Sequence, residues 1–66
     1  MRKENTVDEL LTVEEAAVRL GLAQVTIRSW ILRRRIGFVK LGRSIRIPAD
    51  ELSRLVSAGF IPAAPR

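Results

Sequence analysis

The chain has 66 residues, with 12 Lys and Arg against 7 Asp and Glu, which gives a formal net charge of +5 at pH 7. It contains no histidine, cysteine or tyrosine, so disulfides, structural zinc sites and catalysis by His or Cys are excluded. A chain of this length forms a single domain, and it contains no apolar run long enough to span a membrane. We therefore expect a small cytoplasmic binding module that is not an enzyme, holds no metal or other cofactor, and has no membrane partner.

The positive charge is concentrated in the middle of the chain. The 34 residues between Glu15 and Asp50 contain no acidic residue. The same interval holds eight basic residues, which are Arg19, Arg28, Arg33, Arg34, Arg35, Lys40, Arg43 and Arg46. Segregation of this kind indicates a polyanionic partner more strongly than net charge alone.

The first helix is predicted over residues 13–20. Thr12 and Glu15 have the spacing of a capping box, in which each side chain accepts a hydrogen bond from the other residue's backbone N–H. Apolar residues recur at helical spacing as far as Leu20, and Gly21 is suited to end the helix in the left-handed conformation.

A second helix is predicted over residues 24–34, after a tight turn. Ala23 stands where a capping side chain is preferred, so the start of this helix is weakly capped. The inward face is expected to carry Ile27, Trp30, Ile31 and the aliphatic stem of Arg34, and the outward face Val25, Arg28, Ser29 and Leu32. Two short helices joined by a turn containing Gly21 indicate a helix-turn-helix.

Residues 38–41 and 44–47 alternate apolar and polar around Gly42 and Arg43, which predicts a β-hairpin. We expect Lys40 and Arg46 to face water, and the core-facing residues to be Val39, Leu41, Ile45 and Ile47.

Pro48 ends the second strand and suits the start of a third helix over 49–58. Asp50 and Glu51 are explained by the positive end of that helix, whose buried stripe is expected to be Leu52, Leu55 and Val56. Residues 1–9 are expected to form a flexible arm, residues 10–58 the domain, and residues 59–66 a mobile tail containing prolines. The predicted core comprises Leu20, Ile27, Trp30, Ile31, Ile45 and Leu52.

Residues 10–56 resemble the excisionase-type winged helix-turn-helix DNA-binding domains, relatives of the MerR DNA-binding head. The resemblance rests on residues 11–17, Leu20-Gly21-Leu22, residues 26–31 and residues 41–48 taken together. It implies a mainly α fold with a small hairpin, in the order α-α-β-β-α, with one helix in the major groove and the hairpin as a wing at the minor groove. Family members commonly have polar residues where this chain has Ala23 and Val25. It also implies a bacterial protein of a phage or mobile element, associated with the nucleoid.

The outward face of the second helix supplies the candidate base contacts. Arg28 suits a guanine, Gln24 an adenine and Val25 a thymine methyl group, and the full set is Gln24, Val25, Thr26, Arg28 and Ser29. A solvated polar face is the alternative, although this face carries no acidic residue. Candidate backbone contacts are Arg33, Arg34, Arg35, Lys40 and Arg46, and candidate minor-groove contacts are Arg43 and Ser44.

Simpler explanations exist for several of these residues. Cations complement the negative end of a helix, which accounts for one arginine after the second helix more easily than for three. Gly42-Arg43-Ser44 also suits an ordinary turn, and Trp30 fits the core better than a base-stacking role. Leu32 and Phe60-Ile61 either pack locally or contact a neighbouring copy, and the sequence leaves both open.

Three functions fit these residues. The first, implied by the resemblance, is an excisionase that binds duplex DNA cooperatively with neighbouring copies, bends it and directs an integrase. The second is a small transcriptional regulator with the same DNA-binding head. The third is an adaptor whose basic face binds an acidic protein. A ligand-sensing regulator is disfavoured, because we expect no sensor domain beyond the head.

Overall fold

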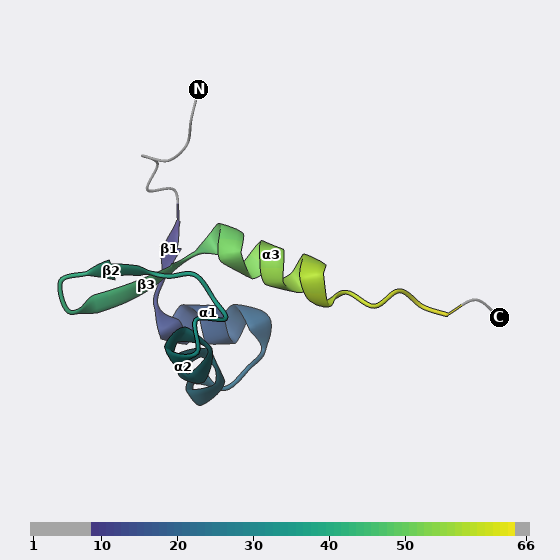
Figure 1. Cartoon of the computed structure of the whole chain (residues 1–66), viewed down its shortest axis with the longest axis horizontal. Coiled ribbons are helices and arrows are strands. Elements are labelled where there is room, and N and C mark those ends of the chain that lie inside the picture. Colours follow the sequence, from purple (N-terminus) through teal and green to yellow (C-terminus); the bar gives the residue numbers. More distant parts are fainter. Residues whose placement is uncertain (1–8, 65–66) are drawn as a thin grey trace, which may run out of the picture.

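The computed structural model describes residues 9–64, which form three helices and a small antiparallel sheet (Figure 1). The elements in chain order are β1 (Leu10–Leu11), α1 (Val13–Leu20), α2 (Gln24–Leu32), β2 (Val39–Leu41), β3 (Ser44–Pro48) and α3 (Ala49–Gly59). The predicted order lacked β1, so the order α-α-β-β-α was incomplete and β-α-α-β-β-α is correct. The predicted flexible arm lies outside the described residues except for Glu9, as do residues 65–66 of the predicted tail.

Helix α1 has the predicted bounds and both predicted ends. The Thr12 hydroxyl accepts from the Glu15 N–H at 3.0 Å, and the Thr12 N–H donates to the Glu15 carboxylate at 2.9 Å. At the other end Gly21 has φ 68°, which lets the Leu22 N–H reach the Ala17 carbonyl oxygen at 2.9 Å. Local sequence therefore determines this helix.

Helix α2 ends at Leu32, two residues earlier than predicted. Arg34 has φ 59°, a left-handed conformation that ends the helix through N–H bonds from Arg34 to Ile31 and from Arg35 to Trp30. The expectation that the stem of Arg34 joins the buried face was wrong. Because the helix has already ended, Arg34 is exposed, with its guanidinium carbon 5.8 Å from the centroid of the Phe38 ring. As predicted, Ala23 provides no side-chain hydrogen bond at the start of α2.

The strands form one sheet in the order β1-β3-β2, with both pairings antiparallel. In the first pairing Leu11 lies opposite Ile47, and the Ala49 N–H adds a bond to the Glu9 carbonyl oxygen at 3.1 Å. A strand of two residues has no periodicity of its own, so only its pairing with β3 reveals it.

The predicted faces of the hairpin were partly wrong. A two-residue turn pairs an odd-numbered residue of β2 with an even-numbered one of β3, and directly opposed residues share a face of the sheet. The observed pairs are Val39 with Arg46, Lys40 with Ile45, and Leu41 with Ser44. The β2 residues expected in the core therefore lie on the opposite face from Ile45 and Ile47. Leu41 is accordingly 53% exposed.

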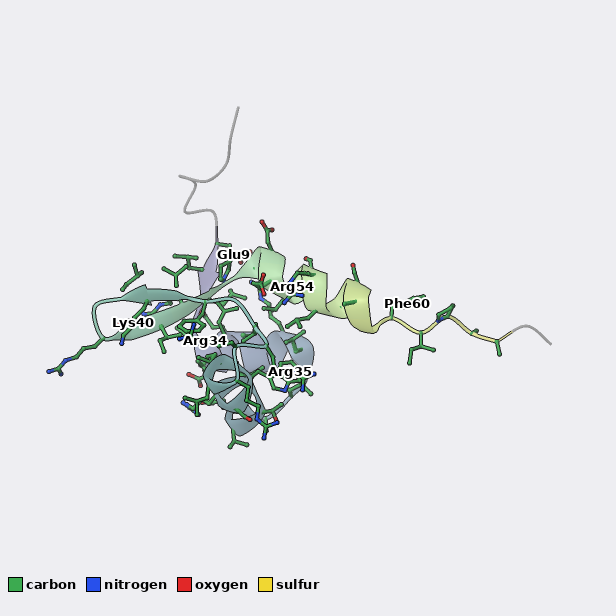
Figure 2. The ribbon with its side chains drawn as sticks, in the orientation of Figure 1. Glu9, Arg34, Arg35, Lys40, Arg54 and Phe60 are labelled. Carbon is green, nitrogen blue, oxygen red and sulfur yellow. The ribbon has the colours of Figure 1, made fainter. Side chains whose placement is uncertain are left out.

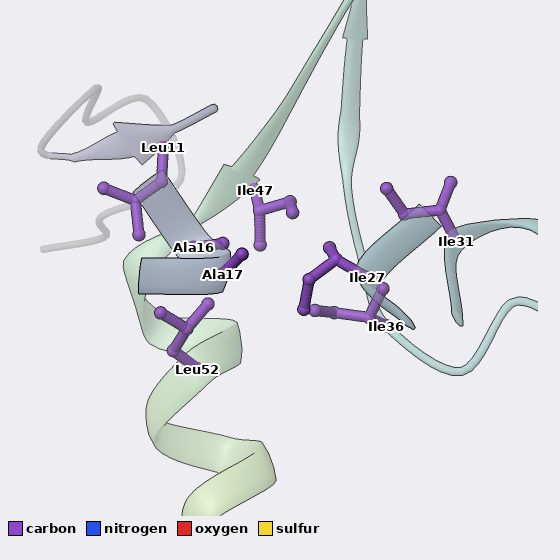
Figure 3. Packing of buried hydrophobic residues seen from close by; sticks show 8 residues of the cluster. All are labelled: Leu11, Ala16, Ala17, Ile27, Ile31, Ile36, Ile47 and Leu52. Carbon is purple, nitrogen blue, oxygen red and sulfur yellow. The ribbon is translucent and has the colours of Figure 1, made fainter. Parts of the chain in front are cut away.

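The core lies between α1, α2, the sheet and the first turn of α3 (Figure 3). Ile27 and Ile47 are fully buried at its centre. Leu20, Trp30 and Ile45 are half-buried and pack against this cluster rather than filling it. The buried residues are Leu11, Ala16, Ala17, Ile27, Ile31, Ile36, Ile47 and Leu52.

Ile36 and Val56 also depart from the expected core. Ile36, in the segment between α2 and β2, is 2% exposed although it belongs to no helix or strand. Val56 was expected to be buried but is 58% exposed. The reason is that α3 projects away from the rest of the molecule after its first turns (Figure 1), so Leu55 still packs against the core but Val56 does not.

Candidate nucleic-acid interface

An open groove of about 600 Å³ runs between the start of α1, the outward face of α2 and the hairpin. It brings together Gln24 and Arg28 from α2 with Arg43 and Arg46 from the hairpin. These four polar side chains come from segments 15 or more residues apart, so their meeting is a product of the tertiary fold. We call this surface the α2 groove; its other lining residues are Thr12, Val13, Glu14, Ile31, Leu32 and Ile45.

Arg28 is held on the outward face of α2 by its neighbour one turn earlier. Its Nη2 donates to the Gln24 side-chain oxygen at 3.2 Å, and both side chains are exposed. Val25 and Leu32 share this outward face, with exposed fractions of 70% and 83%. The face therefore offers a guanidinium between two apolar side chains, a combination suited to the edges and methyl groups of base pairs.

The remaining α2 candidates are less accessible. Thr26 and Ser29 are half-buried, and neither lines the α2 groove. Ser29 was expected on the outward face, but its partial burial, like that of Thr26, limits it to the edge of any contact that this face makes.

The candidate DNA contacts on the hairpin differ in their exposure to solvent. Arg43 and Ser44 are exposed at the turn, where Gly42 adopts φ 62°. Arg46 was expected to face water, but it is half-buried and its Nη1 donates to the Ile45 carbonyl oxygen at 2.9 Å. This bond holds the Arg46 side chain close to the strand, on the wall of the α2 groove.

The other predicted backbone contacts do not join the α2 groove. Arg34, Arg35 and Lys40 line a second hollow together with Arg54. Figure 2 labels these four side chains. The second hollow shares no lining residue with the α2 groove, and Arg33 lines neither. The remaining lining residues of the second hollow are Ile36, Gly37, Phe38 and Glu51.

Glu51 and Arg54 attach the segment after α2 to helix α3. The Glu51 Oε1 accepts from the Gly37 N–H at 2.8 Å and from Arg54 Nη2 at 2.9 Å. Arg54 Nη2 also donates to the Arg35 carbonyl oxygen at 3.5 Å. A Cβ on Gly37 would lie 2.9 Å from the Glu51 Cδ, so a larger residue here would require the end of the Glu51 side chain to move.

The hydrogen bonds from Arg54 and then from the Gly37 N–H hold the pKa of Glu51 below its ordinary value, against a smaller opposing effect of burial. Sequence reasoning assigned Glu51 only to the helix terminus and did not find Arg54. The one available signal was their i, i+3 spacing, and its meaning depends on where residue 37 lies.

Residues 10–59 match the family model described as a helix-turn-helix domain. The chain belongs to this family. No curated protein and no solved structure matches it. A helix-turn-helix domain implies DNA as the partner, and such domains are typically not enzymes. Within residues 9–64, no helix has the length and apolar character needed to cross a membrane.

In this helix-turn-helix domain, α1 and α2 are the two helices of the motif, and Gly21 begins the turn between them. The second helix of such a motif enters the major groove with its N-terminal residues at the base edges. Gln24, Val25 and Arg28 occupy that part of α2 and are exposed. Their roles as base contacts, and those of the basic residues as backbone contacts, stay predictions.

Proposed function

We propose that this helix-turn-helix domain binds duplex DNA sequence-specifically, with α2 in the major groove and the β2–β3 hairpin as a wing at the neighbouring minor groove. The observation that carries the proposal is the α2 groove, which sets Gln24 and Arg28 beside Arg43 and Arg46. When α2 contacts the base edges of a duplex, the neighbouring DNA backbone lies within reach of Arg43 and Arg46 on the hairpin. A merely solvated helix face has no reason to be matched with a basic hairpin in this way.

Each candidate has a role set by its chemistry. Arg28 donates in bidentate fashion to a guanine, Gln24 pairs with an adenine, and Val25 contacts a thymine methyl group. Arg43 enters the minor groove, where negative potential is enhanced when the groove is narrow. At this primary contact, phosphate contacts by Arg33 and Arg46 supply affinity and register without selecting a sequence.

Within DNA-binding proteins, we propose the role of an excisionase, supported by the resemblance of residues 10–56 to that family. Bending a site by 40–90° costs on the order of 1–6 kcal/mol, so neighbouring copies acting together on adjacent sites are expected, alongside an integrase. A small transcriptional regulator is the alternative. The two differ in DNA shape: an excisionase bends its site strongly, which the mobility of circularly permuted duplexes measures.

The test of DNA recognition begins with selection of bound sequences from a random duplex pool. Affinity for the selected site, measured by fluorescence anisotropy, should fall with salt with a slope of about −0.9 per phosphate contact, and so about −4 to −6. A flat salt response contradicts the proposal. Equal competition by heparin and by the selected duplex favours an adaptor for an acidic protein instead.

Two substitutions separate base from phosphate contacts. Arg28→Ala should reduce discrimination between the selected site and a scrambled duplex, by about 1–3 kcal/mol. On duplexes of about 30 base pairs, Arg34→Ala should weaken binding to both sequences by the same factor, because a phosphate contact carries no sequence information. Arg19→Ala on α1 is a control for net charge, since Arg19 pairs with Glu9 and lines neither the α2 groove nor the second hollow. Equal loss of discrimination in all three variants contradicts the assignment of Arg28.

A further inference from the structure

The two basic residues within the strands of the hairpin line different hollows. Arg46 lies opposite Val39 and Lys40 lies opposite Ile45, so Lys40 and Arg46 point to opposite faces of the two-stranded ribbon. Arg46 lines the α2 groove, whereas Lys40 lines the second hollow. The two hairpin cations therefore belong to two separate surfaces, which share no lining residue.

The second hollow has the charge of an anion site. Four basic side chains and one carboxylate line it, which leaves a net charge of +3. The carboxylate, Glu51, is already engaged by Arg54 and by the Gly37 N–H. Among residues 9–64, no ion pair engages Arg34, Arg35 or Lys40. Three cations are therefore available to an external anion.

The hollow is also partly organised before any ligand binds. Hydrogen bonds to Glu51 orient Arg54, and the guanidinium of Arg34 lies over the Phe38 ring. The bonds from Gly37 and Arg54 to Glu51 and the Arg35 carbonyl hold the segment that carries Arg34 and Arg35 against α3. Ordering the cations in advance reduces the entropy lost when a ligand is bound.

We propose that the second hollow binds a second stretch of DNA phosphodiester backbone, separate from the one at the α2 groove. This inference rests on the proposed function, because it takes the α2 groove as the primary DNA contact. A straight duplex in that groove meets Arg28, Arg43 and Arg46, none of which lines the second hollow. Backbone reaches the second hollow either when the same duplex bends around the domain or when a second duplex approaches.

The experiment compares a duplex of about 12 base pairs carrying only the selected site with one of about 30 base pairs that has the same site at its centre. The variants are Arg35→Ala and Lys40→Ala, and Arg19→Ala is the matched control for charge. Arg35 and Lys40 are exposed, and within residues 9–64 Arg35 forms hydrogen bonds only through its backbone, so circular dichroism should show unchanged folding. Binding is measured by anisotropy between 50 and 200 mM salt.

The wild-type domain should bind the longer duplex more tightly than the short one. Arg35→Ala and Lys40→Ala should each lose this additional affinity for the longer duplex and bind the short duplex as the wild type does. On the longer duplex the salt slope of each variant should be less negative than that of the wild type by about 0.9. Between 50 and 200 mM salt, each variant should therefore lose about 3.5-fold less affinity than the wild type does. Energy transfer between the ends of the long duplex detects bending, and co-capture of two differently labelled duplexes detects bridging. The proposal is supported if one of these two signals is lost in both hollow variants and kept in Arg19→Ala. A bending signal identifies the same duplex as the source of the second backbone stretch, and a bridging signal identifies a second duplex.

Two results overturn the proposal. One is an equal loss of affinity for both duplexes, which would place Arg35 and Lys40 on the primary contact. The other is no loss for either duplex, which would leave the hollow without a DNA contact. Failure of the proposed function is recognised separately, because the wild-type domain would then show no selected site and Arg28→Ala would not change discrimination.

Discussion

Arg34 occupies a backbone conformation that favours glycine, and substitution separates the contribution of its backbone from that of its side chain. Both α1 and α2 end with a residue at positive φ, which is Gly21 after α1 and Arg34 near the end of α2. For a residue with a Cβ this conformation costs roughly 1–2 kcal/mol. An arginine at this position is consistent with the proposed phosphate contact of its guanidinium.

The magnitudes follow from the two contacts of Arg34. Replacement by Ala keeps the unfavourable backbone conformation and loses the contact with Phe38, which is worth about 0.5–1 kcal/mol at an exposed site. Replacement by Gly relieves the conformation but adds about 0.5–1 kcal/mol of backbone entropy cost. We therefore expect Arg34→Gly to be about 0.5–1 kcal/mol more stable than Arg34→Ala and close to the wild type.

Thermal unfolding followed by circular dichroism measures the difference, which corresponds to about 2–8 °C in Tm for a domain of this size. The matched control is Arg33, whose φ of −88° gives glycine no advantage, so Arg33→Gly should be less stable than Arg33→Ala. Both Arg34 variants should lose DNA affinity equally, because both lack the cation. An Arg34→Ala domain as stable as Arg34→Gly would refute the role assigned to the backbone.

Three further predictions concern the core and the attachment of the basic segment. Ile27→Ala should cost about 2–5 kcal/mol in urea unfolding, because it empties the fully buried centre of the core; a smaller loss would contradict that placement. Gly37→Ala should destabilise by about 0.5–1.5 kcal/mol, because Glu51 must shift and its bond from the residue-37 N–H is weakened, whereas Gly59→Ala, with no atom within 4 Å, should not. Because the pKa of Glu51 is lowered by folding, the stability that it contributes is present above its unfolded pKa and is lost as the pH falls through the folded value. Glu51→Gln should therefore flatten the loss of stability below about pH 5, and an unchanged pH profile would contradict this.

Prediction from sequence worked best where the determinants are local. The capping box at Thr12 and Glu15 and the left-handed Gly21 set both ends of α1, and all the atoms involved lie within a few residues. The two-residue turn of the hairpin was also found, but its consequence for register was not followed. Counting residues across that turn is enough to place Leu41 on the face opposite Ile45.

The misses involve contacts between distant segments. Strand β1 exists only because β3 lies beside it, and the burial of Ile36 depends on how the segment after α2 crosses the core. The attachment of Gly37 to Glu51 joins residues 14 positions apart. No periodicity or cap signals such contacts, because each requires the rest of the chain to be in place.

The sequence alone determined the two helices of the motif, the hairpin and the concentration of positive charge between Glu15 and Asp50, since these depend on spacing along the chain. Tertiary structure alone decided how that charge is distributed in space. The hairpin separates Lys40 from Arg46, so the basic interval becomes two surfaces instead of one. The physical reason is that strand pairing alternates side chains between faces, and a linear count of charges contains no information about faces.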